Sequence, residues 1–405
     1  MDVQCLEYGI MKYGTPLYVF HVDEMKELVE LFRRELPERT GICFAMKANP
    51  FLVRQMSALT DRIEVCSVGE FEICRELGIC PEKILISGVL KVKKEIYEIL
   101  NYYRGTCAYT VESWDQYQTF VEWCNTNREP VRVYLRLTSG NQFGADEKTI
   151  QKMISVRKMC PFLKIQGIHY FSGTQKKTMD KVKKELGYLD GFLRELEEMF
   201  QFPIKELEYG PGIPVSYFKG QKDMFVEDIR SIIQGIQAME WKGKITLEMG
   251  RALAARCGYY MTGVKEIKQN NCRNYCIVDG GIHQMNYDGQ IRGMYCPEFQ
   301  VSPQRMGGLK QEYTVCGSLC TVNDVLIQKA EICDLQVGDV LIFKGAGAYA
   351  ITEGMALFLS HELPQAASYS RETGWKLIRK KQETYQWNME MEIDDGYIDE
   401  YFNGN

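Results

Sequence analysis

The chain alternates short β-rich runs with segments of helical pattern, and this alternation constrains its fold more than any other feature. Eight runs are expected to form strands, at 41–47, 62–67, 83–88, 107–113, 131–137, 164–173, 206–210 and 244–251. A connection of helical length precedes each run, which is the pattern of parallel strands joined by helices. Eight such units predict an α/β fold with a closed (β/α)8 TIM-like barrel. An open doubly wound sheet produces the same alternation and remains the alternative.

Downstream of about residue 255 the pattern changes to short strands broken by Gly, Asn and Asp, with few helical stretches between them. The segments YYMTGVKEIKQ, YTVCGSLC and GDVLIFKGAGAY are typical. We therefore predict four parts. N-terminal strands at 1–22 join a β domain, the barrel occupies 23–255, the mostly β domain occupies 256–385, and 386–405 form an acidic surface tail.

Composition excludes several classes of protein. Lys and Arg number 49 against 54 Asp and Glu, a formal net charge of −5, which argues against a nucleic-acid surface. No run of about 18 uninterrupted apolar residues occurs, so no membrane partner is expected, and the first residues do not resemble a signal peptide. Fifteen cysteines, an odd number without a CxxC pair, indicate reduced thiols in a cytoplasmic protein. The spacing of Cys316 and Cys320 suits a metal poorly, so no metal site is expected.

Polar side chains collect at the carboxyl ends of the expected strands, where barrels carry their active sites. Lys47, His169 and Glu248 stand at three of these ends, although charged groups are rarely buried unless they are paired or used. Glycine turns follow the last two strands, at Gly210-Pro211-Gly212 and Gly250-Arg251, where barrels often bind phosphate through backbone N–H groups. Each feature alone is typical of an ordinary turn or surface residue. A lysine, a phosphate cradle and a carboxylate in one barrel mouth together predict pyridoxal 5'-phosphate as cofactor.

Segments along nearly the whole chain resemble the fold-type III pyridoxal-phosphate decarboxylases, the group that contains diaminopimelate, ornithine and arginine decarboxylases. The matching segments are FAMKAN, EVCSVGE, GIHYFSGTQ, LEYGPG, LEMGR, IVDGG, CTVND and GAY. This resemblance implies an alanine racemase-like barrel followed by a β-sandwich or β-barrel domain. Within the group, GIHYFSGTQ, VDGGIH, LCTVND and KLIRKK look most like the butirosin-pathway branch, which decarboxylates glutamate tethered to an acyl carrier protein.

The resemblance also implies roles for individual residues. Lys47 forms the imine with the cofactor, Glu248 pairs with the pyridine nitrogen, and His169 stacks on the ring. Cys320, supplied by the other subunit of a homodimer with shared active sites, returns a proton to the carbanion. The residues expected to hold the phosphate or to position the lysine and the ring are Glu64, Arg136, Thr174, Gly210, Gly212, Gly250, Arg251 and Tyr349. The residues expected to bind substrate are Arg251, Arg292, Thr321, Asp324 and Tyr349.

The chain departs from the family pattern at two places that bear on function. Pro211 interrupts the usual glycine triplet and removes one backbone donor for the phosphate. Thr321 follows Cys320 where diaminopimelate enzymes carry a Glu that pairs with the distal ammonium of their substrate. We therefore expect an α-decarboxylase of a carrier-tethered or modified amino acid, acting through an external aldimine and a quinonoid. A diaminopimelate or other free basic amino-acid decarboxylase is the alternative, and a non-catalytic regulatory paralogue is the second.

Overall fold

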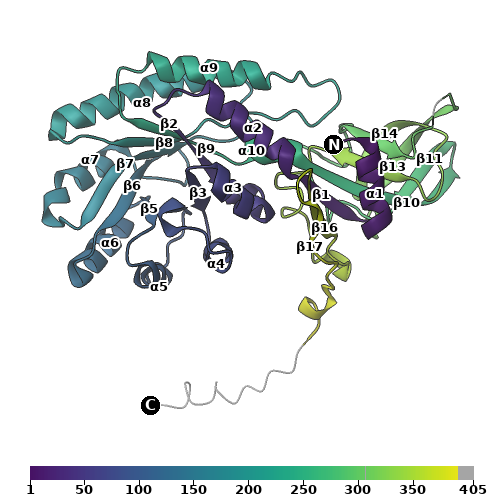
Figure 1. Cartoon of the computed structure of the whole chain (residues 1–405), viewed down its shortest axis with the longest axis horizontal. Helices are drawn as coiled ribbons and strands as arrows, with labels where there is room; N and C mark the ends of the chain where they lie inside the picture. Colours follow the sequence, from purple (N-terminus) through teal and green to yellow (C-terminus); the bar gives the residue numbers. More distant parts are fainter. Residues whose placement is uncertain (306, 391–405) are drawn as a thin grey trace, which may run out of the picture.

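The computed structural model describes residues 1–305 and 307–390, and the greater part of the predicted acidic tail lies outside these residues. Eight parallel strands close into a barrel in the order in which they occur in the chain (Figure 1). They are β2 (Thr40–Ala45), β3 (Arg62–Val65), β4 (Ile84–Ile86), β5 (Ala108–Val111), β6 (Val131–Leu137), β7 (Leu163–Phe171), β8 (Glu206–Gly210) and β9 (Lys244–Met249). Because β9 pairs with β2 through five residue pairs, the barrel is confirmed and the open sheet is excluded.

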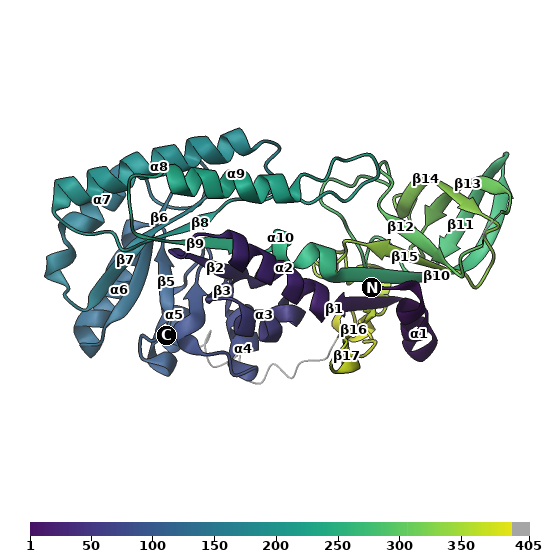
Figure 2. The same cartoon turned by 45° about the horizontal axis from the view of Figure 1, so that its top comes forward.

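Helices surround the barrel, as the alternating pattern predicted (Figures 1 and 2). They are α2 (Val22–Glu35), α3 (Val53–Leu59), α4 (Val68–Glu76), α5 (Lys93–Tyr103), α6 (Trp114–Asn127), α7 (Glu147–Ser155), α8 (Met179–Phe200), α9 (Phe225–Ala238) and α10 (Arg251–Ala254). Ser67, Ser113 and Asp146 cap α4, α6 and α7, because each side-chain oxygen accepts a hydrogen bond from a backbone N–H in the first turn. Each cap fixes the residue at which the loop after β3, β5 or β6 ends and the helix begins. The caps therefore fix these loops at the rim of the barrel mouth.

The N-terminal segment contains a strand that joins the β domain, as predicted for 1–22, and before it a helix that was not predicted. Residues Val3–Tyr13 form helix α1, capped by Asp2 and ended by Gly14 at a φ of 76°. Only β1 (Leu17–His21) is a strand here. The helix escaped prediction because it is short and carries a glycine, Gly9, in its interior. Gly9 is required there, since a Cβ atom would lie 2.3 Å from the ring of Trp375.

The strands after the barrel form a nine-stranded mixed sheet together with β1 (Figure 2). They are β10 (Gly258–Asn270), β11 (Arg273–Val278), β12 (Phe299–Ser302), β13 (Lys310–Cys316), β14 (Val325–Cys333), β15 (Val340–Lys344), β16 (Gln365–Ser370) and β17 (Gly374–Arg379). Strand β1 runs antiparallel to β10 and parallel to β16. The predicted mostly β domain is confirmed in kind. Strand β12 was missed because it is only four residues long, and β16 because its small and polar residues carry little alternation.

The β domain touches the barrel mouth through the segment that follows β15. The side-chain amide of Asn49 donates to the carbonyl of Gly347 at 2.8 Å, and the backbone N–H of Tyr349 donates to the carbonyl of Ala48 at 2.7 Å. Asn49 is fully buried at this contact. These two bonds bring the ring of Tyr349 next to the turn that carries Lys47.

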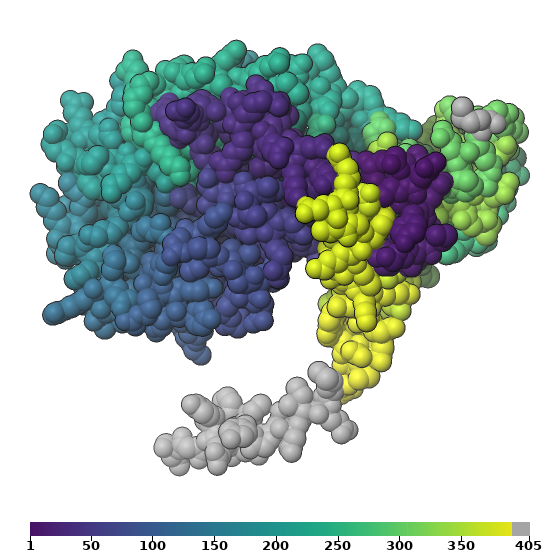
Figure 3. Space-filling model, in the orientation of Figure 1, coloured from purple at the N-terminus to yellow at the C-terminus, as the bar shows by residue number. Residues whose placement is uncertain are grey.

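A surface groove separates the barrel from the C-terminal strands, where Figure 3 shows the molecule hollowed between the two parts. It is lined by residues of α3, α4 and β17, among them Phe51, Ile73 and Leu377. Among the described helices, none is both long enough and apolar enough to cross a membrane.

Candidate active site

Lys47 lies where β2 ends, on a single 3-10 turn formed by Met46–Ala48. Its Nζ is 2.8 Å from Oε2 of Glu64, at the end of β3, and 3.8 Å from Oε1 of Glu248, at the end of β9. Burial disfavours the charge on Lys47, but the carboxylates of Glu64 and Glu248 outweigh burial and hold its pKa well above the usual value. The lysine of the cofactor-free protein is therefore protonated and paired.

Glu248 also contacts His169, whose Nε2 lies 2.8 Å from Oε2 of the carboxylate. Both side chains are buried. Burial alone would raise the pKa of Glu248, but Lys47 and His169 hold it at about 2. The carboxylate is thus ionised at every physiological pH and can neutralise a protonated ring nitrogen.

Glycine turns form the wall of the cavity next to this cluster. Gly212 has a φ of 65°, and a Cβ atom there would lie 2.2 Å from the carbonyl oxygen of Gly173. A Cβ atom on Gly250 would lie 2.8 Å from that of Ala48. The residues around the cavity include Lys47, Thr174, Gly212, Glu248, Gly250, Arg251 and Tyr349. Because no side chain fits at either glycine, the backbone is left open to a ligand.

The chemistry of this cavity fits pyridoxal phosphate. A paired lysine, an ionised carboxylate and two side-chain-free turns lie around one space. Two buried nitrogens at its edge, Nδ1 of His169 and Nε of Arg251, have no hydrogen-bond partner among the described residues. Unpaired buried polar groups are costly, and Nε of Arg251 is a donor, so a ligand that presents an acceptor to it is expected to stabilise the site.

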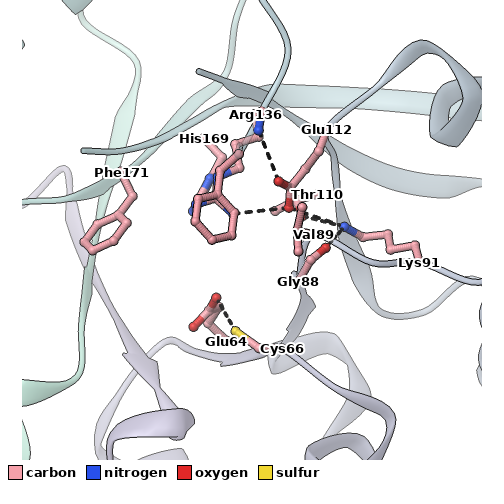
Figure 4. A network of polar contacts seen from close by, with 12 residues as sticks. Glu64, Cys66, Gly88, Val89, Lys91, Thr110, Glu112, Arg136, His169 and Phe171 are labelled. Atoms are coloured by element: carbon pink, nitrogen blue, oxygen red, sulfur yellow. Dashed lines mark hydrogen bonds and ion pairs between the residues drawn. The ribbon is translucent and has the colours of Figure 1, made fainter. Parts of the chain in front are cut away.

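Four predicted cofactor residues lie next to the cavity without lining it. Glu64 and His169 contact the lining residues Lys47 and Glu248. Gly210 faces Phe171, which lines the cavity and whose ring would lie 2.3 Å from a Cβ atom on the glycine. Arg136 lies further out and directs Nη1 toward Oε1 of Glu112 at 3.1 Å, within the network of Figure 4.

The remaining predicted residues lie in the β domain. Arg292, Thr321 and Asp324 line a groove of about 580 Å³, and Cys320 is exposed beside it. None of the residues that line this groove also lines the cavity around Lys47. The carboxylate of Asp324 is buried and accepts hydrogen bonds from the backbone N–H groups of Ile282 and Leu319, at 2.9 and 2.7 Å. Within one chain the predicted residues thus fall into two groups, and Asp324 holds the loop that carries Cys320.

Sequence reasoning missed three side chains in or beside the cleft. The thiol of Cys66 lies 3.5 Å from Nζ of Lys47. The hydroxyl of Tyr217 accepts from Arg251 at 2.9 Å, and the ammonium of Lys91 is buried beside Glu112. Lys91 was missed because it stands in a lysine-rich segment. Cys66 lies two residues after the motif residue Glu64, so the position of Cys66 alone was a usable signal.

Comparison with known proteins agrees with this site. The family model described as "Pyridoxal-dependent decarboxylase, C-terminal sheet domain" matches residues 17–347. A diaminopimelate decarboxylase from Aquifex aeolicus is 27% identical, over 94% of this chain and 92% of that protein. The L-glutamyl-[BtrI acyl-carrier protein] decarboxylase from Niallia circulans is 26% identical, over 91% and 92%. The motifs had suggested the carrier-linked branch. Overall sequence similarity does not favour that branch over diaminopimelate decarboxylase.

Solved structures share the fold. A protein from Aquifex aeolicus superposes with a TM-score of 0.82 at 25% identity, over 95% of this chain and 94% of that chain. Diaminopimelate decarboxylase from Methanocaldococcus jannaschii in complex with L-lysine superposes with a TM-score of 0.79 at 24% identity, over 92% and 91%. Both combine a barrel with a β-sheet domain, as this chain does.

Proposed function

The chain belongs to the pyridoxal-dependent decarboxylase family, and from this premise we propose that it removes the α-carboxylate of a free amino acid with a charged distal end, diaminopimelate first among them. The observation that supports the activity most is the cluster in which Lys47 contacts both Glu64 and Glu248, while Glu248 contacts His169. A regulatory paralogue has no need to keep such a cluster, because buried charges lower stability unless they are fully paired.

Pyridoxal phosphate supplies an electron sink for the electron pair that remains when carbon dioxide leaves. Lys47 would hold it covalently, Glu248 would pair with its ring nitrogen, and His169 would contact the ring. The residues that would bind its phosphate are Thr174, Gly212, Gly250, Arg251 and Tyr349, which line the cavity. Glu64 accepts a hydrogen bond from Nζ of Lys47 at 2.8 Å. It therefore orients the amine and determines the pH at which the amine loses its proton and becomes nucleophilic.

We propose that Cys320 of a second copy completes the site. Its thiol would return a proton to the α-carbon after carbon dioxide has left. In one chain Cys320 lies exposed in the β domain, beside a groove whose lining is separate from that of the Lys47 cavity. A head-to-tail homodimer places such a groove against the barrel mouth of its partner, and each dimer then holds two shared sites.

The β-domain groove supports diaminopimelate over lysine or ornithine. Arg273, Arg292 and Lys329 line it together with Glu312, and none of these four side chains forms an ion pair with another described residue. An amino acid whose distal end carries both a carboxylate and an ammonium matches this set. Glu312 then replaces the family glutamate that is missing at Thr321.

A carrier-tethered amino acid is the second candidate, because the same groove holds more cations than available carboxylates. Asp324 is committed to two backbone N–H groups, so Glu312 stands against three cations. Such a groove attracts the phosphate of a carrier arm, or an acidic carrier protein.

Carbon dioxide release by the cofactor-loaded protein tests both candidates. Free diaminopimelate, lysine, ornithine, arginine and glutamate are compared with glutamyl-loaded acyl carrier protein, with Lys47→Ala as the inactive control. We expect diaminopimelate to be turned over. Release from the carrier alone would replace the first candidate by the second. A loaded protein that retains its visible absorption band but releases carbon dioxide from none of them would support the regulatory paralogue.

A further inference from the structure

Lys91 is a second lysine at the barrel mouth, and its environment differs from that of a surface lysine. It lies in the loop between β4 and α5, and its side chain is 3% exposed. Figure 4 shows it turned back toward the barrel, where its Nζ donates to the carbonyl of Gly88 and, at 3.1 Å, to the hydroxyl of Thr110. Lysines in such loops ordinarily extend into water, so a specific partner must hold this one inside.

That partner is Glu112, which two cations share. Its Oε1 lies 3.1 Å from Nη1 of Arg136 and 3.6 Å from Nζ of Lys91. Its Oε2 accepts from the backbone N–H of Gly144 at 3.1 Å. The carboxylate therefore ties the ends of β5 and β6 to the loop after β4.

Arg136 connects this pair to the cofactor cluster. One face of its guanidinium lies 4.6 Å from the ring centre of Phe143. In the sheet register Arg136 stands opposite His169, which binds Glu248. The charge of Arg136 helps to keep the pKa of Glu248 low, after the larger effects of Lys47 and His169.

Within this set of ion pairs, Lys91 supplies the third positive charge. Lys47, Lys91 and Arg136 stand against the carboxylates of Glu64, Glu112 and Glu248, three positive charges against three negative. If Arg136 were the sole partner of Glu112, the carboxylate would cancel the positive charge of the guanidinium, and Glu248 would no longer experience that charge.

We propose that Lys91 is a positioning residue that shares Glu112 with Arg136 and so leaves part of the positive charge of Arg136 uncancelled near the cofactor site. Burial lowers the pKa of Lys91 to about 8, although Glu112 favours the charged form and Arg136 opposes it. The nearby thiol of Cys66 has a smaller effect, also in favour of the charged form. Lys91 therefore carries its proton at neutral pH and loses it in mildly alkaline solution.

Lys91→Met tests this role, with Lys93→Met as the matched control. Lys93 lies two residues away in sequence but is exposed and paired with Glu122 at 2.7 Å, outside the network. The readout is the pH at which the visible absorption band of the lysine-bound cofactor changes, measured without substrate. Removing a positive charge near the cofactor favours its protonated form. We therefore expect Lys91→Met to raise this midpoint by about one pH unit, the size of one charge acting through several ångströms of protein, and Lys93→Met to leave it unchanged.

Glu112→Gln provides the opposite charge change. It removes a negative charge and is expected to lower the midpoint, whereas a merely structural loss would move both variants in the same direction. Lys91→Arg keeps the charge and should restore the parent midpoint, which also covers the case in which Lys91→Met folds poorly. A midpoint in Lys91→Met equal to that of Lys93→Met, or shifts of the same sign in Lys91→Met and Glu112→Gln, would overturn the proposal. The inference rests on the proposed cofactor site, but a spectral shift without any carbon dioxide release would refute only the proposed function.

Discussion

Glu208 carries a prediction that follows from the packing of the barrel interior. It lies on β8 in the barrel interior, is fully buried, and shares the guanidinium of Arg62 with Glu206. Glu206 also accepts hydrogen bonds from Tyr134, at 2.6 Å, and from Thr246, whereas Oε1 of Glu208 has no partner among the described residues. Of the two carboxyls, Glu208 is therefore the one that keeps a proton.

The size of the effect follows from the pKa values. Burial raises the pKa of Glu208 to about 8, although Arg62 opposes the rise. Between the unfolded pKa and this value the folded state binds one proton more than the unfolded state, so stability falls as pH rises, by about 1.4 kcal/mol per pH unit. Between about pH 5.5 and about pH 7.5 this one group removes about 3 kcal/mol, and Glu208→Gln, which has no proton to lose, should not show that loss.

Urea unfolding of the cofactor-free protein and of Glu208→Gln at the two pH values measures the effect. The expected result is similar stability at the lower pH and an advantage for Glu208→Gln at the higher one. Glu206→Gln is the matched control on the same strand. Burial would raise the pKa of Glu206, but Arg62, Thr246 and Tyr134 hold it at about 2, so this variant should lose stability at both pH values. A difference between the parent and Glu208→Gln that does not change with pH would refute the reasoning, because Glu208 would then be ionised in the folded protein.

Three further predictions concern the site. Lys47→Ala and Cys320→Ala are each expected to be inactive alone. When equal amounts are dissociated, mixed and reassociated, half of the dimers hold one intact shared site, so about a quarter of the parent activity should return. No recovery of activity would contradict the shared site. Gly212→Ala should weaken cofactor binding by at least about tenfold, because its φ of 65° and the nearby carbonyl leave no room for a Cβ atom, whereas Gly220→Ala, with a φ of 83° and nothing within 4 Å, should bind normally in an absorbance titration. Glu64→Gln removes the main charge that keeps Lys47 protonated, so the rate of cofactor loading, followed by stopped-flow absorbance, should reach its plateau at lower pH than in the parent.

The part of the site that could be predicted from sequence is the part that barrel geometry brings together. Lys47 and Glu248 are about two hundred residues apart, yet β2 and β9 are hydrogen-bonded neighbours once the barrel closes. Because the carboxyl ends of all eight strands meet at one rim, a strand pattern was enough to place Lys47, His169 and Glu248 close together. Glu64 was expected only from the family resemblance. The fold was predictable for the same reason, since the strand spacing is periodic and needs no knowledge of side-chain contacts.

What escaped prediction depends on contacts that no local pattern encodes. Lys91 is buried because its loop turns the side chain inward toward Glu112, although it stands beside Lys93 and Lys94 in a segment that reads as a solvated surface. Helix α1 exists because its small residue Gly9 packs on Trp375, far away in the sequence.

The interior of this barrel is more polar than the layers of branched side chains that usually fill such barrels, and its charges are arranged in two levels. At the mouth level, Lys47, Lys91 and Arg136 pair with Glu64, Glu112 and Glu248. One layer below, Arg62 contacts both Glu206 and Glu208, whereas Lys244 contacts Glu206 alone, at 3.5 Å, and burial keeps the proton on Glu208. Glu248 itself contributes to that proton's retention, because its negative charge raises the pKa of Glu208. The converse also holds by linkage. When Glu208 is protonated, Glu248 has no second negative charge below it, so Glu248, the carboxylate assigned to the cofactor's ring nitrogen, stays ionised in the buried interior.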